Sequence, residues 1–368
     1  MKRFLLICFA LLLTPIDWAY GFNQPSTSLQ RYLEDNPNQL PLIEQLSVRV
    51  HSQPIRLSSI YPETLKIAVI LRTDPEIPQN QAWFFAFKRR MQELNMDFRL
   101  DVFYVPRDEG TLAMFYKYQS IQATSFDYVI VDGVDDYNRP LIEHLLLQDG
   151  SKVIILNSFA PFPAWHLHPP LLYIGTDKAL MMHRLASLLD RGLDSNAVID
   201  AISEVSPTSG QSDCQMFLNE LAGLGRSVRY RYRVKDLEEG IEPVLDALLA
   251  KQPDERQHFI FSCTPKISER VIDVLMTNPS MSASTNAWLG QRRLDAAHQQ
   301  GVVMVTVLDM KDYMAIAAAE AIKADIELRL LPRVYTETVT FLTRDMDQQT
   351  RQLTFQQALQ YSFALWPR

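Results

Sequence analysis

A strand followed at once by a long helix, between Gly301 and Leu330, is the feature that most constrains the fold. Val302 to Leu308 is a run of β-branched and apolar residues, which is typical of a strand buried on both faces of a parallel sheet. The next segment is rich in good helix formers, and Asp312 is expected to cap its first turn. Asp309 lies at the carboxyl end of the strand, where ligands bind in open α/β sheets.

The same alternation of strand and helix patterns runs along the chain from Leu65. Strands are predicted over 65–71, 97–104, 126–131, 152–156, 171–175, 196–202, 228–234, 258–262, 285–288 and 302–308. Helices are predicted over 83–94, 111–123, 140–147, 179–189, 215–224, 242–249 and 268–276, and over 29–50 with a break at Asn36-Pro37. This succession predicts an α/β protein of two doubly wound parallel-sheet units.

Length and charge limit the class of protein. A chain of 368 residues favours two domains, and a net charge of -7 argues against a nucleic-acid partner. Lys2 and Arg3 precede the short apolar run Phe4 to Leu13, which predicts a signal peptide over 1–21 with cleavage after Gly21. No later segment has the roughly 18 apolar residues of a membrane span.

The cysteine content says little about the fold. Removal of the signal peptide leaves Cys214 and Cys263, and two cysteines in a large protein do not make a disulfide framework. Buried free thiols are the favoured interpretation, with a disulfide as the alternative.

No nucleophile elbow, Walker loop, dinucleotide fingerprint or HExxH metal motif is found. Asp132, Asp135 and Asp136 follow a predicted strand; Asp132 is a candidate ligand-binding acid, and the other two fit a solvated turn better. His166 and His168 are two residues apart, but a proline-rich loop explains them better than a metal pair.

Aromatic residues are a second group of candidates, since aromatic faces stack on sugar rings or planar cations. Most of the cluster at Trp83, Phe84, Phe85 and Phe87 must be core at helical spacing. Trp288 is a better candidate, because it ends a short strand at the carboxyl edge of the sheet.

Several segments together carry a family resemblance. They are RYLEDNPNQL, PIRLS, LKIAVIL, FKRRMQELNM, PLLYIGTD, FIFSCT, NAWLG and VTVLDMKDYMAIAAAEAIKADIEL, spread from about Tyr32 to Leu342. On these segments the chain resembles the type I periplasmic binding proteins, and among them the autoinducer-2 receptors of the LuxP type.

The resemblance implies two lobes around a ligand cleft, joined by three crossings of the chain near 175–178, 309–312 and 335–338. The expected parts are a helical extension and linker (22–64), a first lobe (65–175 with 310–336) and a second lobe (176–309 with 337–368). Closure of the lobes on a ligand is the expected motion.

The resemblance also implies a set of ligand-binding residues: Gln79, Asn80, Trp83, Ser158, Asp213, Thr264, Trp288 and Asp309. The strand-end acid Asp132 completes the predicted set. Asn157 and Pro265 are the alternatives to Ser158 and Thr264 if the alignment slips by one residue. Asp213 and Asp309 stand where the autoinducer-2 receptors have arginines, and an aspartate only accepts hydrogen bonds. We therefore expect a ligand rich in hydroxyl or ammonium donors.

The resemblance implies a periplasmic receptor, monomeric when free, that closes on a small polar ligand and signals to an inner-membrane sensor kinase. The ligand is expected to be a sugar, a polyol, a cationic metabolite or an autoinducer-like molecule. The alternative is the substrate-binding component of a sugar-type ABC transporter, with a permease as partner. No cofactor, metal or enzymatic activity is expected; a hydrolase using Asp132 and Asp309, and a decayed cleft, are the remaining interpretations.

Overall fold

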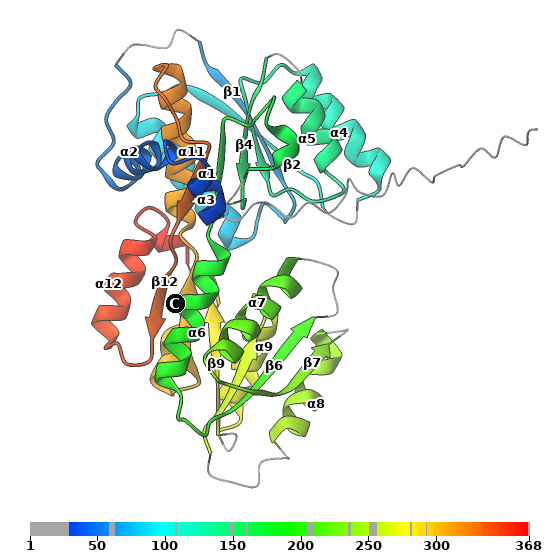
Figure 1. Cartoon of the computed structure of the whole chain (residues 1–368), viewed down its shortest axis with the longest axis vertical. Coiled ribbons are helices and arrows are strands. Elements are labelled where there is room, and N and C mark those ends of the chain that lie inside the picture. Colours follow the sequence, from blue (N-terminus) through cyan, green and yellow to red (C-terminus); the bar gives the residue numbers. More distant parts are fainter. Residues whose placement is uncertain are drawn as a thin grey trace, which may run out of the picture.

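The structure, a computed structural model, describes residues 29–58, 63–106, 109–147, 150–158, 161–204, 209–234, 237–249, 256–279, 282–291 and 293–366. In this part of the chain, two lobes are each built on a six-stranded sheet with helices on both faces (Figure 1). The predicted fold class is therefore confirmed. The predicted signal peptide lies outside the described residues.

The sheet of the first lobe has the order β11-β5-β4-β3-β1-β2, and all its neighbouring strands are parallel. Its strands are β1 (Leu65–Leu71), β2 (Phe98–Tyr104), β3 (Tyr128–Asp132), β4 (Lys152–Leu156), β5 (Leu172–Thr176) and β11 (Val334–Glu337). One face is covered by α2 (Gln39–His51), α3 (Pro78–Glu93) and α11 (Lys311–Ile326), and the other by α4 (Thr111–Ala123) and α5 (Arg139–Leu147). The central strands are apolar because both of their faces are buried.

The sheet of the second lobe has the order β12-β10-β9-β8-β6-β7, in which only the β10–β12 pair is antiparallel. Its strands are β6 (Val198–Glu204), β7 (Val228–Val234), β8 (His258–Ser262), β9 (Ala283–Trp288), β10 (Val303–Leu308) and β12 (Thr340–Thr343). One face carries α6 (Lys178–Gly192) and α7 (Ser209–Gly223). The other carries α8 (Leu237–Leu249), α9 (Pro265–Thr277) and α10 (Leu294–Gln299).

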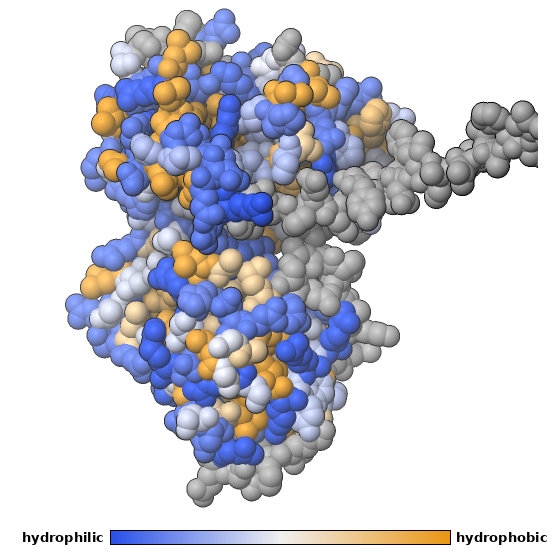
Figure 2. Space-filling model, in the orientation of Figure 1, coloured by the Kyte–Doolittle hydropathy of each residue, from blue (hydrophilic) through white to orange (hydrophobic). Residues whose placement is uncertain are grey.

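The chain passes between the sheets three times in the described residues: after β5, after β10 and after β11. The strands on either side of the third passage, β11 and β12, were not predicted from sequence. Each has only four residues, so neither offers the long apolar run that marks β1 or β10. Figure 2 shows the surface narrowing between the two lobes.

The amino-terminal extension belongs to the first lobe. It forms α1 (Leu29–Asp35) and α2, with the break between them at Asn36-Pro37 as predicted. Leu46 and Val50 of α2 are fully buried in the core that contains α11. The ring of His51, the last residue of α2, stacks on Tyr313 of α11 at a centroid distance of 4.6 Å. The extension is therefore anchored beside the second passage of the chain.

Asp312 does not cap α11, as the sequence suggested. The N-cap is Met310, which makes no side-chain capping bond, and the Asp312 carboxylate is fully buried. It accepts hydrogen bonds from the Tyr361 backbone N–H (2.7 Å), the Ser362 backbone N–H (2.9 Å) and the Ser362 hydroxyl (2.6 Å). The Asp312 carboxylate therefore accepts its hydrogen bonds from Tyr361 and Ser362, which are distant in sequence, and does not cap its own helix.

Two further helices, α10 and α12 (Gln348–Ala358), were not predicted. Within the residues that the structure describes, none of the helices has the length and apolar composition of a membrane span.

Candidate functional site

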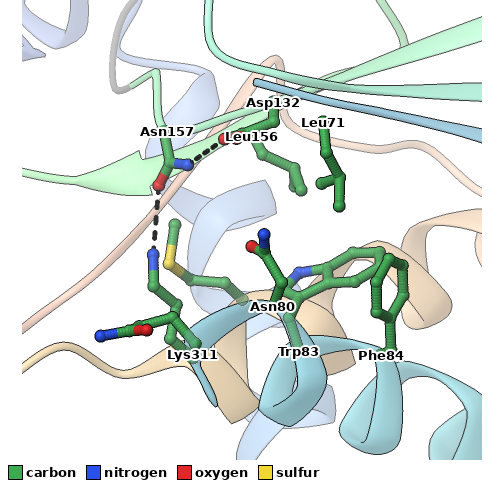
Figure 3. A pocket seen from close by; sticks show the side chains of 10 residues that line it. Leu71, Asn80, Trp83, Phe84, Asp132, Leu156, Asn157 and Lys311 are labelled. Atoms are coloured by element: carbon green, nitrogen blue, oxygen red, sulfur yellow. Dashed lines mark hydrogen bonds between the residues drawn. The ribbon is translucent and has the colours of Figure 1, made fainter. Parts of the chain in front are cut away.

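A small recess, with an internal volume of about 20 Å³, lies at the carboxyl edge of the first sheet. Its walls come from the ends of β1, β3 and β4 and from the first turns of α3 and α11 (Figure 3). It is lined by Leu71, Gln79, Asn80, Trp83, Phe84, Asp132, Leu156, Asn157, Lys311 and Met314. Ligands bind outside the carboxyl ends of the strands in open α/β sheets, and this recess is in that place.

A chain of hydrogen bonds forms the polar wall of the recess. The Asn157 amide donates to the Asp132 carboxylate, and its oxygen accepts from the Lys311 ammonium at 3.4 Å (Figure 3). Lys311 also forms an ion pair with Asp309 at 2.8 Å. Burial opposes the charge on Lys311, but the carboxylates of Asp309 and Asp132 hold its pKa above the ordinary value. The wall therefore offers a carboxylate, an amide and an ammonium group.

Trp83 forms the aromatic wall. Its side chain is almost fully buried and stacks on Phe87 with an interplanar angle of 9° and a centroid distance of 5.0 Å. Its indole N–H has no hydrogen-bond partner among the described residues. Figure 3 shows the indole beside Phe84, with its nitrogen on the side nearer Asn80. A buried donor without a partner costs stability, so a ligand oxygen here would satisfy it.

Gln79 and Asn80 are fixed at the mouth of the recess. The Asn80 amide donates to the Thr73 hydroxyl at 3.0 Å and to the Asp74 carbonyl at 2.7 Å, which holds the loop between β1 and α3. The Gln79 amide donates to the Leu289 carbonyl at 3.3 Å, in the loop after β9. The carboxyl edges of the two sheets therefore meet at this contact.

The recess brings together four of the predicted residues: Gln79, Asn80, Trp83 and Asp132. Ser158 is not on its wall, whereas its neighbour Asn157 is. Ser158 instead donates its backbone N–H to the Ile174 carbonyl at 3.3 Å.

The predicted residues of the second lobe lie outside the recess. Thr264 caps α9 by accepting from the Ile267 N–H at 3.4 Å, and it donates to Glu204 at 3.4 Å. The Trp288 indole donates to the Ser262 carbonyl at 3.0 Å, so this residue ends its strand as predicted but its N–H is occupied.

Asp213 and Asp309 are not isolated negative charges. Lys178 lies 2.8 Å from the Asp213 carboxylate, and Lys311 lies 2.8 Å from that of Asp309. Each of these charges is balanced by an ammonium group, so a cationic ligand would have to compete with a lysine, whereas hydroxyl donors would not. Lys178 and Lys311 were missed from sequence, although both lie within predicted crossings of the chain.

The other candidate acids have structural roles. Asp135 accepts from the backbone N–H groups of Tyr137 (3.0 Å) and Asn138 (3.1 Å) and pairs with Arg72 at 2.8 Å. Burial opposes its ionisation, but Arg72 and the Asn138 N–H hold the pKa of Asp135 below the ordinary value. Asp136 is exposed. These two residues form the turn before α5, as the sequence favoured.

The two cysteines of the second lobe are joined by a disulfide, so the expectation of free thiols is wrong. Cys214 in α7 and Cys263 after β8 have Cα atoms 5.2 Å apart, within the range of a disulfide. Packing of α7 on the sheet brings them together across 49 residues of chain. Asp213 and Thr264, each next to a bridged cysteine, are thereby held on the same side of the lobe.

No protein-family model matches the chain. A periplasmic ribose ABC transporter protein from Conexibacter woesei DSM 14684 is structurally similar, with a TM-score of 0.62 and 13% identity over 78% of this chain and 97% of that one. A carbohydrate transporter solute-binding protein from Agrobacterium radiobacter, in complex with D-arabinose, gives 0.61 at 11% identity, covering 80% and 99%. An ABC transporter solute-binding protein from Burkholderia graminis C4D1M, also with D-arabinose, gives 0.60 at 17% identity, covering 78% and 98%. The chain therefore has the fold of the type I periplasmic binding proteins.

Proposed function

We propose that this protein binds a neutral, hydroxyl-rich small molecule of the sugar class between its lobes in the periplasm. The observation that carries the proposal is the recess wall on which Asp132, Asn157 and Lys311 are joined by hydrogen bonds opposite the indole of Trp83. Carboxylate, amide and ammonium groups supply both acceptors and donors for hydroxyl groups, and an aromatic face packs on the apolar face of a sugar ring.

Charge balance favours a neutral ligand over an ion. Asp213 is paired with Lys178, and Asp309 with Lys311, each at 2.8 Å. An anion would have to compete with the carboxylates for these lysines, and a cation would have to displace them. A sugar hydroxyl can instead donate to a carboxylate without breaking either ion pair.

Delivery of the bound sugar to a membrane permease is the proposed role, as the substrate-binding component of an ABC transporter. The similarity to solute-binding proteins of sugar transporters supports it. The bound solute would leave unchanged, so no enzymatic step is proposed.

A receptor for a membrane sensor kinase is the second candidate. It is supported by the extension, whose RYLEDNPNQL and PIRLS segments resemble the autoinducer-2 receptors of the LuxP type. In the structure this extension packs on α11 at the second passage, where it could report lobe closure.

A thermal-shift screen of residues 22–368 against pentoses, hexoses, polyols, polyamines and autoinducer-2 with borate tests the proposal. A sugar at about a hundred times its Kd is expected to add roughly 2.7 kcal/mol of stability. Asp132→Ala should abolish this shift, and Asp136→Ala, at an exposed neighbouring position, should retain it. A shift with autoinducer-2 alone would favour the sensor role, and a shift with polyamines alone would overturn the charge argument.

A further inference from the structure

The last described residues of the chain contact both lobes. Helix α12 packs on β12 of the second lobe, and the short helix η2 (Phe363–Leu365) that follows contacts α3 of the first lobe. Residues 359–366, expected in the second lobe, therefore lie against both lobes. They form a noncovalent connection in addition to the three covalent passages of the chain.

The attachment to the first lobe is polar. The buried Asp312 carboxylate accepts two backbone N–H groups and one hydroxyl from Tyr361 and Ser362, at 2.6 to 2.9 Å. The Tyr361 hydroxyl donates to Glu93 of α3, and the Arg89 guanidinium lies 4.4 Å from the centre of the Tyr361 ring. Asp312 is next to Lys311, so this attachment also fixes the turn of α11 that presents Lys311 to the recess.

The attachment to the second lobe is apolar and centres on Trp366, which is 4% exposed. Its indole N–H donates to the Ser362 hydroxyl at 2.9 Å, and its ring packs in a cluster shared by both lobes. The buried members of the cluster are Ala82, Leu289, Leu308, Met310, Leu342, Ala358, Leu359 and Trp366.

Gly290 shows how closely this packing approaches the recess. A Cβ atom at Gly290 would lie 3.0 Å from the Trp366 ring and 2.7 Å from the Gln79 amide nitrogen. Trp366 and the recess residue Gln79 therefore both lie close against the loop after β9 at Gly290. Loss of the indole would remove one of the contacts that hold this loop, and with it Gln79, in place.

We propose that residues 359–366 form a clasp, a segment that holds the two lobes against each other and positions Gln79 and Lys311. Ser362 and Trp366 are positioning residues in this proposal, because neither lines the recess. The clasp goes beyond the proposed function, because it concerns how the two lobes are held together. Only an effect of the clasp on sugar affinity would rest on the proposed function.

Hydrogen–deuterium exchange of the unliganded protein tests the clasp with Trp366→Ala and a matched control, Trp165→Ala. Both indoles are 4% exposed, and both donate to an oxygen: Trp366 to Ser362, and Trp165 to Glu143 at 2.8 Å. Trp165 lies in the core of the first lobe, away from the second. The two variants therefore lose comparable packing but differ in their contact with the lobe junction.

Trp366→Ala is expected to raise exchange at least tenfold in segments 78–82, 289–291 and 311–315, with β3, β4 and β8 unchanged. Trp165→Ala should leave these three segments as in the wild type, and Trp366→Phe should restore most of their protection. Exchange raised only within 359–366, or equally by the two alanine variants, would overturn the clasp.

Ser362→Ala tests the clasp with almost no change in side-chain volume. It replaces Trp366→Ala as the test if that variant does not fold. It removes one donor to Asp312 and the acceptor of Trp366. Faster exchange in the same three segments supports the clasp, and unchanged exchange there contradicts it. The measurement needs no ligand, so its outcome is independent of whether sugars bind.

Discussion

The Gln79 side-chain amide donates to the Leu289 carbonyl at 3.3 Å, joining α3 of the first lobe to the loop after β9 of the second. Gln79 also lines the recess. The same side chain thus belongs both to the candidate site and to the contact between the lobes. A ligand that engages Gln79 would compete with, or strengthen, that contact.

Gly290→Ala is expected to destabilise the protein more than Gly225→Ala. Both glycines have positive φ, 94° and 84°, so an alanine at either costs about 1 kcal/mol of backbone strain. At Gly225 a Cβ meets nothing within 4 Å, whereas at Gly290 it meets Gln79 and Trp366. Displacement of these two side chains by the new methyl group should add about 1–3 kcal/mol to the loss of stability in Gly290→Ala, which urea unfolding measures. Equal losses would show that the junction accommodates the methyl group freely.

Lys311→Gln is expected to weaken sugar binding at least tenfold, a loss of about 1.4 kcal/mol. The substitution removes the cation that pairs with Asp309 and donates to Asn157, and leaves the Asp309 charge unbalanced at the site. Isothermal titration calorimetry measures the change. Lys66→Gln, at an exposed position of β1, is the control and should bind as the wild type does. Unchanged affinity in Lys311→Gln would exclude Lys311 from the site.

Removal of the disulfide is expected to lower the free energy of unfolding. For the 49-residue separation of Cys214 and Cys263, the chain-entropy model gives about 4 kcal/mol, and measured losses for natural disulfides are about 2–5 kcal/mol. Urea unfolding of Cys214→Ala/Cys263→Ala against the wild type tests this. Intact mass under non-reducing conditions is the prior check, because free thiols would add the mass of two hydrogens and refute the bridge.

His298 is expected to make the protein less stable in mild acid. It is 3% exposed, and burial, with nearby Arg351, lowers its pKa from 6.5 to about 4. Between these values the unfolded chain binds the extra proton, so stability is full above pH 6.5 and falls as the pH drops towards 4. The loss is about 3 kcal/mol.

Urea unfolding at several pH values measures this loss. His298→Gln should lose about this much less stability than the wild type between pH 6.5 and 4. His183→Gln, at a site 59% exposed, should lose as much as the wild type. Identical pH profiles for the wild type and His298→Gln would mean that the folded protein takes up this proton as readily as the unfolded chain, so that the pKa of His298 is not lowered.

The strands of the two sheets could be predicted because their signal is local. Buried runs such as Leu65–Leu71 and Val303–Leu308 can be recognised by their apolar, β-branched composition. The order of strands and helices along the chain then implies parallel sheets. By contrast, β11 and β12 are short and exist because β5 and β10 offer them edges to pair with. Such pairing is a property of the fold and cannot be seen in four residues.

The candidate site could be predicted in part, for a similar reason. Asp132 was found because it lies at a strand end, and Trp83 because the family resemblance placed it among the first-loop residues. The partners of the charged residues were not, since Lys178 and Asp213 are 35 residues apart and meet only when α7 packs beside α6. The sequence therefore showed the negative charges of Asp213 and Asp309 without the lysines that balance them.

The most direct test of the central proposal is isothermal titration calorimetry of residues 22–368 with neutral pentoses and hexoses, and separately with spermidine and with autoinducer-2 plus borate. The account predicts saturable binding of at least one neutral sugar, lost in Asp132→Ala and retained in Asp136→Ala. Binding of spermidine or autoinducer-2 with no response to any neutral sugar would contradict it.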